Sequence, residues 1–468
     1  MTDTKMANQD QEDINKIPSD YLPVVYKIQA SKDDIFSYNE KPEFSKNIDY
    51  PKFSFGFQHF VHQSKTKMEV TKQFEGKKKV YYIVNKFERY VDDYESDVNN
   101  ISKAYFDIEP RPNILSRAFY KLWEIFFMFD LIDISGTSDF VSAHLAEGPG
   151  SFIQATMFYR DKFAKKGTSK NDKYYAITLH AEDIQKHVPK LEENFIEYYN
   201  KEKPSRFMMH RTYPKEQARQ SKNKDNGDLT DPKTIQLFGG NFTKQKANLV
   251  TADGGFDWKN ENIQEQEAFK LILAQIITAL KIQAKGGNFI CKIYESFTKV
   301  SSKFISILSS FYKDIYITKP LMSRASNSEK YIVCINFTDS KDKDSKISKL
   351  DNILDKMNKN RNLVDIFPEF KITNEFQTTL IKLNNDIANR QFININEMVT
   401  FIEKQNYRGD EYTQRRQMQI DASKYWLDMF FPDTKDLNTK KNIIVKQTNK
   451  LIDINTKTVE SLQKKLEF

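Results

Sequence analysis

The chain has 468 residues and a mass of 55.1 kDa, several times the common domain size of ~150 residues, so two or three domains are expected. Its 36 Phe and 23 Tyr exclude disorder throughout, two cysteines (Cys291 and Cys334) exclude a disulfide-built fold, and no apolar run approaches the ~18 residues of a membrane span. The net charge of +8 is only a weak indication of an anionic partner. The polar N-terminus is not a secretory signal, so an intracellular protein is expected. Six scattered histidines show no metal-ligand spacing, and no metal site is predicted.

The first hundred residues divide into two predicted parts. Residues 1–20 are polar and are expected to form a disordered tail. Residues 21–100 mix charges with short apolar runs (YLPVVYKI, FSFGFQHFV, KVYYIV) and are predicted to form an N-terminal α+β accessory domain. Nothing in them indicates a function.

Residues 101–340 alternate predicted helices and strands. The strands are expected at 140–146, 174–179, 247–252, 288–294, 315–318 and 330–336, with helices at 114–131, from 152 onward and at 264–285. This alternation predicts a Rossmann-like doubly wound α/β domain with a largely parallel sheet. No helix separates the last two strands, so the final strand is expected to be antiparallel. Residues 341–468 are predicted to be a helical region, with 417–431 (QMQIDASKYWLDMFF) an amphipathic helix that packs on another element.

Charged residues and glycines stand at the predicted strand ends, where α/β proteins build their sites. The loop 147–151 (EGPGS) follows the first strand and opens a helix, although it could be a plain tight turn. Asp253 ends a strand and could instead cap a helix. Lys292 lies inside an apolar strand, where a buried lysine must be paired or shift its pKa, unless it occupies an exposed strand end. Lys121 and Glu329 would each be surface charges if taken singly.

Four segments in order resemble the FtsJ-like S-adenosylmethionine-dependent ribose 2′-O-methyltransferases. They are SRAFYKL (116–122), VTADGGFD (250–257), GGNFICK (286–292), and KP (319–320) with SR (323–324) and NSEKYIVC (327–334). The resemblance covers roughly 110–337. It implies a methyltransferase domain over 101–340 with a catalytic tetrad of Lys121, Asp253, Lys292 and Glu329. Lys292 would be the base or the steering group for the ribose hydroxyl.

Within that family the chain is most similar to mRNA cap methyltransferases of eukaryotes and large DNA viruses. HLAEGPGSFI (144–153) is similar to the loop of the cap-2 type, and QEQE (264–267) indicates the same group. NGDLT (226–230) resembles the segment whose aspartate holds the cofactor adenine. The resemblance implies that S-adenosylmethionine is held by Glu147, Gly148, Pro149, Gly150, Ser151, Phe152, Asp228 and Asp253. Three features depart from the pattern. His144 stands where bacterial members have an aspartate, Ser151 replaces a glycine, and no acid ends strand 174–179 to hold the cofactor ribose.

The function expected is 2′-O-methylation of the first or second transcribed nucleotide of capped mRNA, with RNA and other capping enzymes as partners and no membrane. The location expected is cytoplasmic, with a viral factory, a virion or the nucleus as alternatives. A basic stretch, 201–225, has eight Lys or Arg and three acids around Phe207 and Tyr213, which suits single-stranded RNA but also a solvated loop. The alternatives are an rRNA methyltransferase, a non-catalytic RNA-binding subunit and an NAD-dependent oxidoreductase. The absent GxGxxG spacing disfavours the last.

Overall fold

The computed structural model describes residues 17–29, 31, 33–47, 55–108, 113–136, 139–183, 191, 194, 197, 206–255, 261–405 and 407–466. An eight-stranded sheet lies at its centre, in the order β1-β8-β9-β7-β6-β3-β4-β5. The strands are β1 Val24–Ile28, β3 Val141–Leu145, β4 Lys173–Ile177, β5 Phe207–Met209, β6 Ala247–Ala252, β7 Gln283–Ile293, β8 Tyr312–Lys319 and β9 Lys330–Phe337. A second, two-stranded sheet pairs β2 (Glu43–Phe44) with β10 (Leu363–Asp365).

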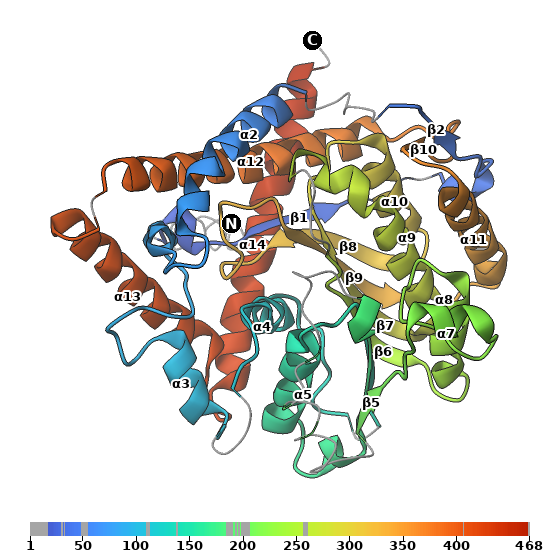
Figure 1. Cartoon of the computed structure of the whole chain (residues 1–468), viewed down its shortest axis with the longest axis horizontal. Coiled ribbons are helices and arrows are strands. Elements are labelled where there is room, and N and C mark those ends of the chain that lie inside the picture. The colour runs from blue at the N-terminus through green and yellow to red at the C-terminus, as the bar shows by residue number, and fades with distance from the viewer. Residues whose placement is uncertain are drawn as a thin grey trace, which may run out of the picture.

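The helices cover both faces of the large sheet (Figure 1). On one face lie α9 (Gln264–Ile282), α10 (Lys299–Ser309) and α8 (Pro232–Gly239). On the other lie α4 (Ala118–Phe129) and α5 (Ser151–Phe163), backed by α13 (Asp410–Phe430) and α14 (Leu437–Leu466). The remaining helices are α2 (Phe55–Lys67), α3 (Val98–Tyr105), α7 (Lys215–Gln220), α11 (Lys343–Lys359) and α12 (Asn374–Glu403).

Each strand serves two cores because successive side chains point to opposite faces. On β7, Phe289 and Cys291 belong to the core beneath α9, whereas Ile290 between them belongs to the core beneath α4 and α5. A strand buried on both faces reads as a continuous apolar run, which is why the central strands were recognisable from the sequence. The doubly wound α/β fold is thereby confirmed.

The last strand of the sheet is antiparallel, as predicted, because β9 lies between β7 and β8 and runs against both. Two strands of this eight-stranded sheet were not predicted. β5 adds a short parallel edge beside β4. β1, from the region expected to be an accessory domain, pairs antiparallel with β8, so residues of 21–100 extend the central sheet. The domain boundaries themselves stay a prediction, and residues 1–16 of the expected tail lie outside the described residues.

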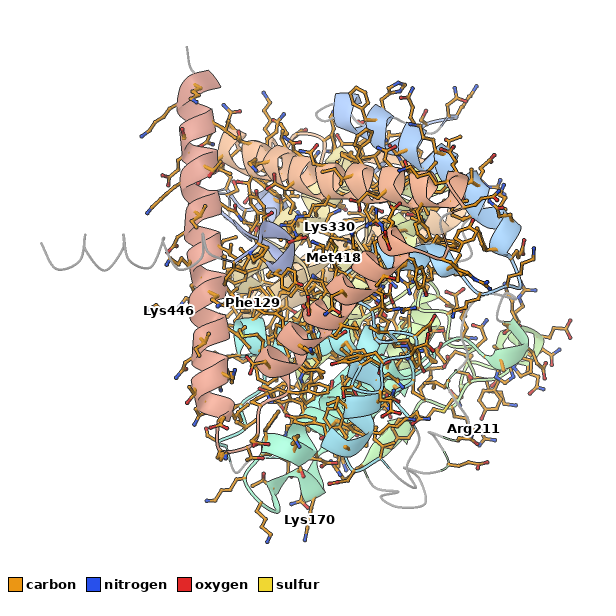
Figure 2. The ribbon with its side chains drawn as sticks, turned by 90° about the vertical axis from the view of Figure 1, so that its left-hand side faces the viewer. Phe129, Lys170, Arg211, Lys330, Met418 and Lys446 are labelled. Carbon is orange, nitrogen blue, oxygen red and sulfur yellow. The ribbon has the colours of Figure 1, made fainter. Side chains whose placement is uncertain are left out.

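The C-terminal region, 341–468, is helical as predicted except for the short strand β10, which was not predicted, and it packs on the rest of the domain. Residues 417–431, expected to form an amphipathic helix, belong largely to α13, which buries Trp426 and Phe430 against α4. In Figure 2, α14 runs along one side of the molecule, with Lys446 on it. Among the described residues, no helix is both long and apolar enough to span a membrane.

Candidate active site

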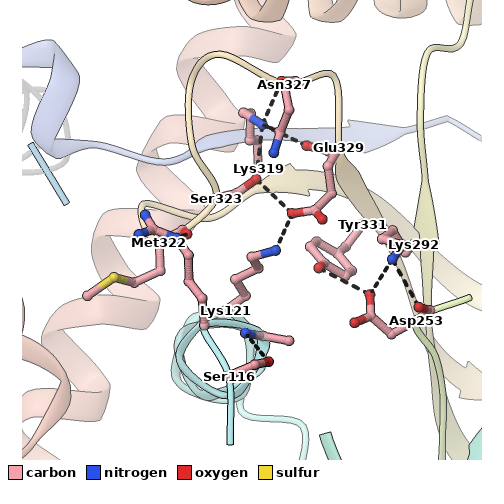
Figure 3. Close-up of polar contacts among 12 residues, drawn as sticks. Ser116, Lys121, Asp253, Lys292, Lys319, Met322, Ser323, Asn327, Glu329 and Tyr331 are labelled. Carbon is pink, nitrogen blue, oxygen red and sulfur yellow. Dashed lines mark hydrogen bonds and ion pairs between the residues drawn. The ribbon is translucent and has the colours of Figure 1, made fainter. Parts of the chain in front are cut away.

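Four charged side chains singled out in the sequence meet at one edge of the sheet (Figure 3). Asp253 directly follows β6, and Lys292 is the penultimate residue of β7. Glu329 directly precedes β9, and Lys121 lies on α4. Lys121 Nζ lies 2.6 Å from Glu329 Oε1, and Lys292 Nζ lies 3.1 Å from Asp253 Oδ1. All four side chains are between 12 and 18% exposed. The four residues therefore form two ion pairs that remain accessible from outside.

The register of the strands explains why these charged residues lie close together. Ala252 of β6 is opposite Cys291 of β7, so Asp253 emerges next to Lys292. Lys292 is in turn opposite Tyr331 of β9, whose hydroxyl donates to Asp253 Oδ1 over 3.4 Å. Because β9 runs antiparallel, its first residues lie beside the carboxyl end of β7, and Glu329 arrives at the same edge.

The neighbouring charges of the cluster set the protonation state of Lys292. Burial alone would lower the pKa of Lys292, but the neighbouring charges, led by Asp253, outweigh burial and raise the pKa above its ordinary value. Lys292 Nζ also donates to the Asp253 carbonyl at 2.9 Å. The ammonium form is thus the stable one in this arrangement, which favours a steering role over that of a base.

Lys319 is a third lysine near the cluster, and it was not among the site residues predicted from the sequence. It holds Glu329 in place through hydrogen bonds. Lys319, at the end of β8, donates to the Glu329 carbonyl at 2.8 Å and to Ser323 Oγ at 3.0 Å. Ser323 Oγ in turn donates to Glu329 Oε1 at 2.9 Å. Burial lowers the pKa of Lys319 well below its ordinary value. Burial would raise the pKa of Glu329, but the surrounding lysines hold it well below the usual range, so this residue is a carboxylate.

Glu124 fixes the connection between β8 and β9, and it was also missed. Its carboxylate is fully buried and accepts from the backbone N–H groups of Leu321 and Met322, each at 2.7 Å, and from Trp426 Nε1 at 2.9 Å. Burial raises the pKa of Glu124 to about 7, against the opposing effect of these three hydrogen bonds. The available signal was a lone acid inside the apolar run AFYKLWEIFFMF of α4.

The loop after β3 is a helix-capping structure. Glu147 Oε1 accepts from the backbone N–H groups of Phe152 and Ile153, both at 2.8 Å, at the start of α5. Glu147 Oε2 is buried and has no hydrogen-bond partner among the described residues, and burial raises the pKa of this carboxyl well above its usual range. Gly148 and Pro149 follow Glu147 in the loop, and Gly150, with φ +113°, directly precedes α5. Ser151 Oγ, at the start of α5, is 2.6 Å from Ser116 Oγ.

The segment 226–230 lies beside the end of β4. His180 N donates to the Asn226 carbonyl at 2.7 Å, and Gly227 has φ +80° with no room for a side chain, since a Cβ there would lie 2.0 Å from the Thr178 carbonyl oxygen. Asp228 Oδ1 accepts from the backbone N–H and the hydroxyl of Thr230. The 147–152 loop follows the end of β3, as Asp253 follows β6, and segment 226–230 lies beside the residues that follow β4. The predicted cofactor residues are therefore all at strand ends of the parallel half of the sheet.

Two other sequence features have local explanations. His144 is buried on β3 between Ser142 Oγ and Thr251 Oγ1, each 2.8 Å away, and burial lowers its pKa to about 3, so it is a neutral core residue. Strand β4 ends without an acid, as noted from the sequence. Residues 256–257 of the aspartate motif lie outside the described residues.

The basic stretch is only partly a surface feature. Residues 201–205 lie outside the described residues. Arg206 is buried in an ion pair with Asp161 at 2.8 Å, so, contrary to expectation, this arginine does not face solvent. Arg211 and Lys224 instead flank the ring of Tyr213, at 5.1 and 4.7 Å from its centroid. Figure 2 shows Arg211 at the outer edge of the molecule.

Residues 114–337 match the model of the FtsJ-like methyltransferase family. A cap-specific mRNA (nucleoside-2′-O-)-methyltransferase 1A of Caenorhabditis briggsae is 31% identical over 216 residues, which are 43% of this chain and 24% of the relative. An inactive cap-specific mRNA (nucleoside-2′-O-)-methyltransferase 1B of the same organism is 30% identical over 216 residues, 43% of this chain and 25% of that protein. The chain thus spans about a quarter of the length of these relatives. A solved structure, a ribosomal RNA methyltransferase from Plasmodium falciparum, is 19% identical, covers 47% of this chain and 97% of its own, and has a TM-score of 0.30.

Proposed function

We propose, from the premise that residues 114–337 form an FtsJ-like methyltransferase domain, that the protein transfers a methyl group to a ribose 2′-hydroxyl of RNA, at the first or second transcribed nucleotide of capped mRNA. The observation that carries the proposal is the pair of ion pairs, Lys121–Glu329 and Lys292–Asp253, at one accessible sheet edge. Methyl transfer to a weak nucleophile requires that the hydroxyl be held in a fixed orientation, and charged side chains fixed at one place can do this.

S-adenosylmethionine is the proposed methyl donor, and when bound it supplies an electrophilic methyl group on a sulfonium. The residues present fit such a group. The unpaired Glu147 Oε2 offers an acceptor to a cofactor hydroxyl or amine, and Gly227 leaves its segment without a side chain at that position. Asp228 lies in the segment beside the end of β4, and Asp253 directly follows β6. An acidic contact at the end of β4 is absent, so Glu147 is the proposed substitute for holding the cofactor ribose.

The four side chains then have distinct roles. Lys292, as an ammonium, donates to the ribose oxygen, orients it and stabilises the negative charge that develops as the hydroxyl attacks. As the new O–CH3 bond forms and the S–CH3 bond breaks, the hydroxyl proton passes to water, which reaches these partly exposed side chains. Asp253 holds Lys292 in place through two contacts, at its carboxylate and its carbonyl. Lys121 and Glu329 form the opposite wall, where the Glu329 carboxylate can accept a hydrogen bond from the ribose.

The names of the relatives favour a capped mRNA substrate over rRNA. The test is incorporation of labelled methyl into matched RNAs with a cap and an unmethylated first nucleotide, with a cap and a methylated first nucleotide, or with an uncapped 5′ end. Transfer to capped RNA alone supports the proposal, and mapping the modified nucleotide assigns the position. Transfer to uncapped structured RNA alone would favour the rRNA alternative.

A non-catalytic role is the second candidate, because one relative of similar identity is named inactive. The intact pairs of the tetrad favour activity in this chain. A protein that binds capped RNA and S-adenosylmethionine but transfers no methyl group to any of the three RNAs would decide for the non-catalytic role. A cytoplasmic location and association with other capping enzymes remain parts of the proposal.

A further inference from the structure

Both polar contacts of Lys292 described above come from a single residue. Its Nζ lies 3.1 Å from Asp253 Oδ1 and donates to the Asp253 carbonyl at 2.9 Å. The position of this ammonium therefore depends on the position of residue 253. Strand pairing between β6 and β7 ends one residue earlier, where Ala252 is opposite Cys291. On the side of β7, residues 253–255 thus lie beyond the regular hydrogen bonds of the sheet, and other contacts must hold them in place.

Gly254, which follows Asp253, is held at both of its backbone polar groups. Its N–H donates to Gln275 Oε1 of α9 at 3.2 Å, and its carbonyl accepts from the Tyr294 hydroxyl, also at 3.2 Å. Gly254 is buried and Gln275 is 1% exposed, so water does not compete for the bond between them. A Cβ at residue 254 would lie 2.5 Å from Gln275 Oε1, and the close approach of α9 therefore requires a glycine here.

Tyr294 directly follows β7, two residues after Lys292, and both side chains reach the same segment. A Cβ built on Gly255 would lie 3.0 Å from the Tyr294 hydroxyl oxygen and 3.5 Å from Lys292 Nζ. The hydroxyl and the ammonium therefore lie side by side against residues 253–255. Burial raises the pKa of Tyr294 to about 12, so the hydroxyl remains a hydrogen-bond donor at neutral pH. A phenylalanine would fill the same space without holding Gly254.

We propose that Gln275 and Tyr294 are positioning residues: by holding Gly254 from two sides they fix Asp253, and Asp253 in turn fixes the Lys292 ammonium. Their effect on methyl transfer rests on the proposed function, whereas their hold on Lys292 is independent of it. A donor stabilises developing charge only if its position is set before the reaction. A loosely held lysine would therefore lower the rate of methyl transfer without weakening the binding of cofactor or RNA.

Methyl transfer by Tyr294→Phe and Gln275→Leu, measured at saturating S-adenosylmethionine and capped RNA, tests the proposal. The rate in Tyr294→Phe should fall about 10-fold, because the variant removes only the hydroxyl and leaves the Gly254 carbonyl without its donor. Gln275→Leu should lower the rate at least as much. The KM for RNA and the calorimetric affinity for the cofactor should stay within about twofold of the wild type. Tyr407→Phe is the matched control, since the Tyr407 hydroxyl also donates to a backbone carbonyl at 3.2 Å, that of Ile402, in a separate apolar cluster. It should lower stability without lowering the rate.

A second measurement follows Lys292 directly and requires no methyl transfer. Brief acetylation of the full chain with acetic anhydride at about pH 8, without cofactor or RNA, modifies lysines through their neutral amine, and peptide mass spectrometry gives the rate at each position. Lys292 should react about 5-fold faster in Tyr294→Phe, because an ammonium held less firmly beside Asp253 loses its proton more readily. Lys121, which pairs with Glu329, is the internal reference and should react at the wild-type rate. Tyr407→Phe should leave both rates unchanged.

A Tyr294→Phe rate within about twofold of the wild type, or an equal loss in Tyr407→Phe, would overturn the proposal. So would a loss explained wholly by weaker cofactor binding, or an unchanged acetylation rate of Lys292. Thermal unfolding of each variant checks folding, and if Gln275→Leu does not fold, Tyr294→Phe carries the test. If the wild-type protein transfers no methyl group to any RNA, faster acetylation of Lys292 in Tyr294→Phe still supports the hold on this lysine, and the proposed function fails alone. If the wild type is active but rate and acetylation are unchanged in the variant, the positioning role fails alone.

Discussion

Replacing Ser323 by alanine removes one oxygen atom that joins two buried charges. Ser323 Oγ donates to Glu329 Oε1 at 2.9 Å and accepts from Lys319 Nζ at 3.0 Å. Lys319 keeps three other acceptors in the variant, and Glu329 Oε1 keeps Lys121 at 2.6 Å. The ion pair therefore survives, but one of the two groups that orient the Glu329 carboxylate is lost.

The expected loss of activity follows from the loss of this one hydrogen bond to Glu329. A hydrogen bond to a charged group contributes about 1.5–3 kcal/mol. If the orientation of Glu329 matters for methyl transfer, this free energy is lost from the transition state, and kcat falls about 10- to 100-fold. The affinity for S-adenosylmethionine should not change, because Ser323 lies on the Glu329 side of the cluster and not in the 147–152 loop.

Single-turnover methyl transfer to capped RNA, alongside urea unfolding, is the assay. Ser328→Ala is the matched control, since Ser328 lies in the same connection and its hydroxyl makes only a 3.5 Å contact with Gln264. A Ser323→Ala rate within twofold of the wild type, or an equal loss in Ser328→Ala, would refute the positioning of Glu329 by Ser323. A loss that appears only in the free energy of unfolding would assign Ser323 a purely structural role.

Four further predictions address the remaining parts of the site. Lys292→Ala should abolish methyl transfer while calorimetry shows nearly intact cofactor binding; normal turnover would remove Lys292 from the mechanism. Because the folded pKa of Glu124, about 7, is above its ordinary value of 4.5, the stability it contributes is complete below pH ~4.5 and is lost as the pH rises through ~7. Unfolding free energy should therefore fall by up to about 3 kcal/mol across that window, and a slope unchanged in Glu124→Gln would contradict this assignment. Gly227→Ala should lower both stability and cofactor affinity, because its Cβ would lie 2.0 Å from a carbonyl oxygen at φ +80°, and a variant that binds the cofactor normally would show that the segment is not part of the site. Arg211→Ala should weaken RNA binding and reduce the salt dependence by about one charge, whereas Arg206→Ala should lower stability with little effect on the salt dependence; the reverse result would contradict the burial of Arg206.

The parallel half of the fold was predictable because its strands are buried on both faces. The sequence ANLVTA predicted β6 with the observed bounds, and NFICKIY predicted the carboxyl half of β7. β1 and β5 could not be predicted in the same way. Each is at an edge of the sheet, and the partner of β1 is almost 300 residues away in the chain. A short edge strand carries no local pattern that identifies its partner.

The tetrad was predictable for a related reason, since each of its members is at or near the end of an element whose pattern is clear. The residues that hold the tetrad in place were not predictable. Lys319 and Ser323 were noticed only as parts of a motif, and Glu124 was not singled out at all. What makes these residues important is burial and pairing across long sequence distances, such as Glu124 with Trp426, 302 residues later. The spacing of residues along the sequence does not indicate such a contact.

These long-range contacts make the regions outside residues 114–337 part of the site's support. Trp426 of α13 completes the hydrogen bonds of Glu124, which hold the backbone of residues 321–322. From the N-terminal side, Glu88 binds Arg324 of the same connection. From α12, Gln391 Nε2 donates to the Ser326 carbonyl at 3.1 Å.

The β8–β9 connection is therefore held at three points by segments that the family match does not include. This connection ends on Glu329, whose carboxylate must be placed to within fractions of an ångström for it to act on a ribose hydroxyl. A mutation in a flanking helix can thus reduce methyl transfer without touching substrate or cofactor, through the position of one loop. The flanking regions and residues 114–337 are therefore joined at this loop.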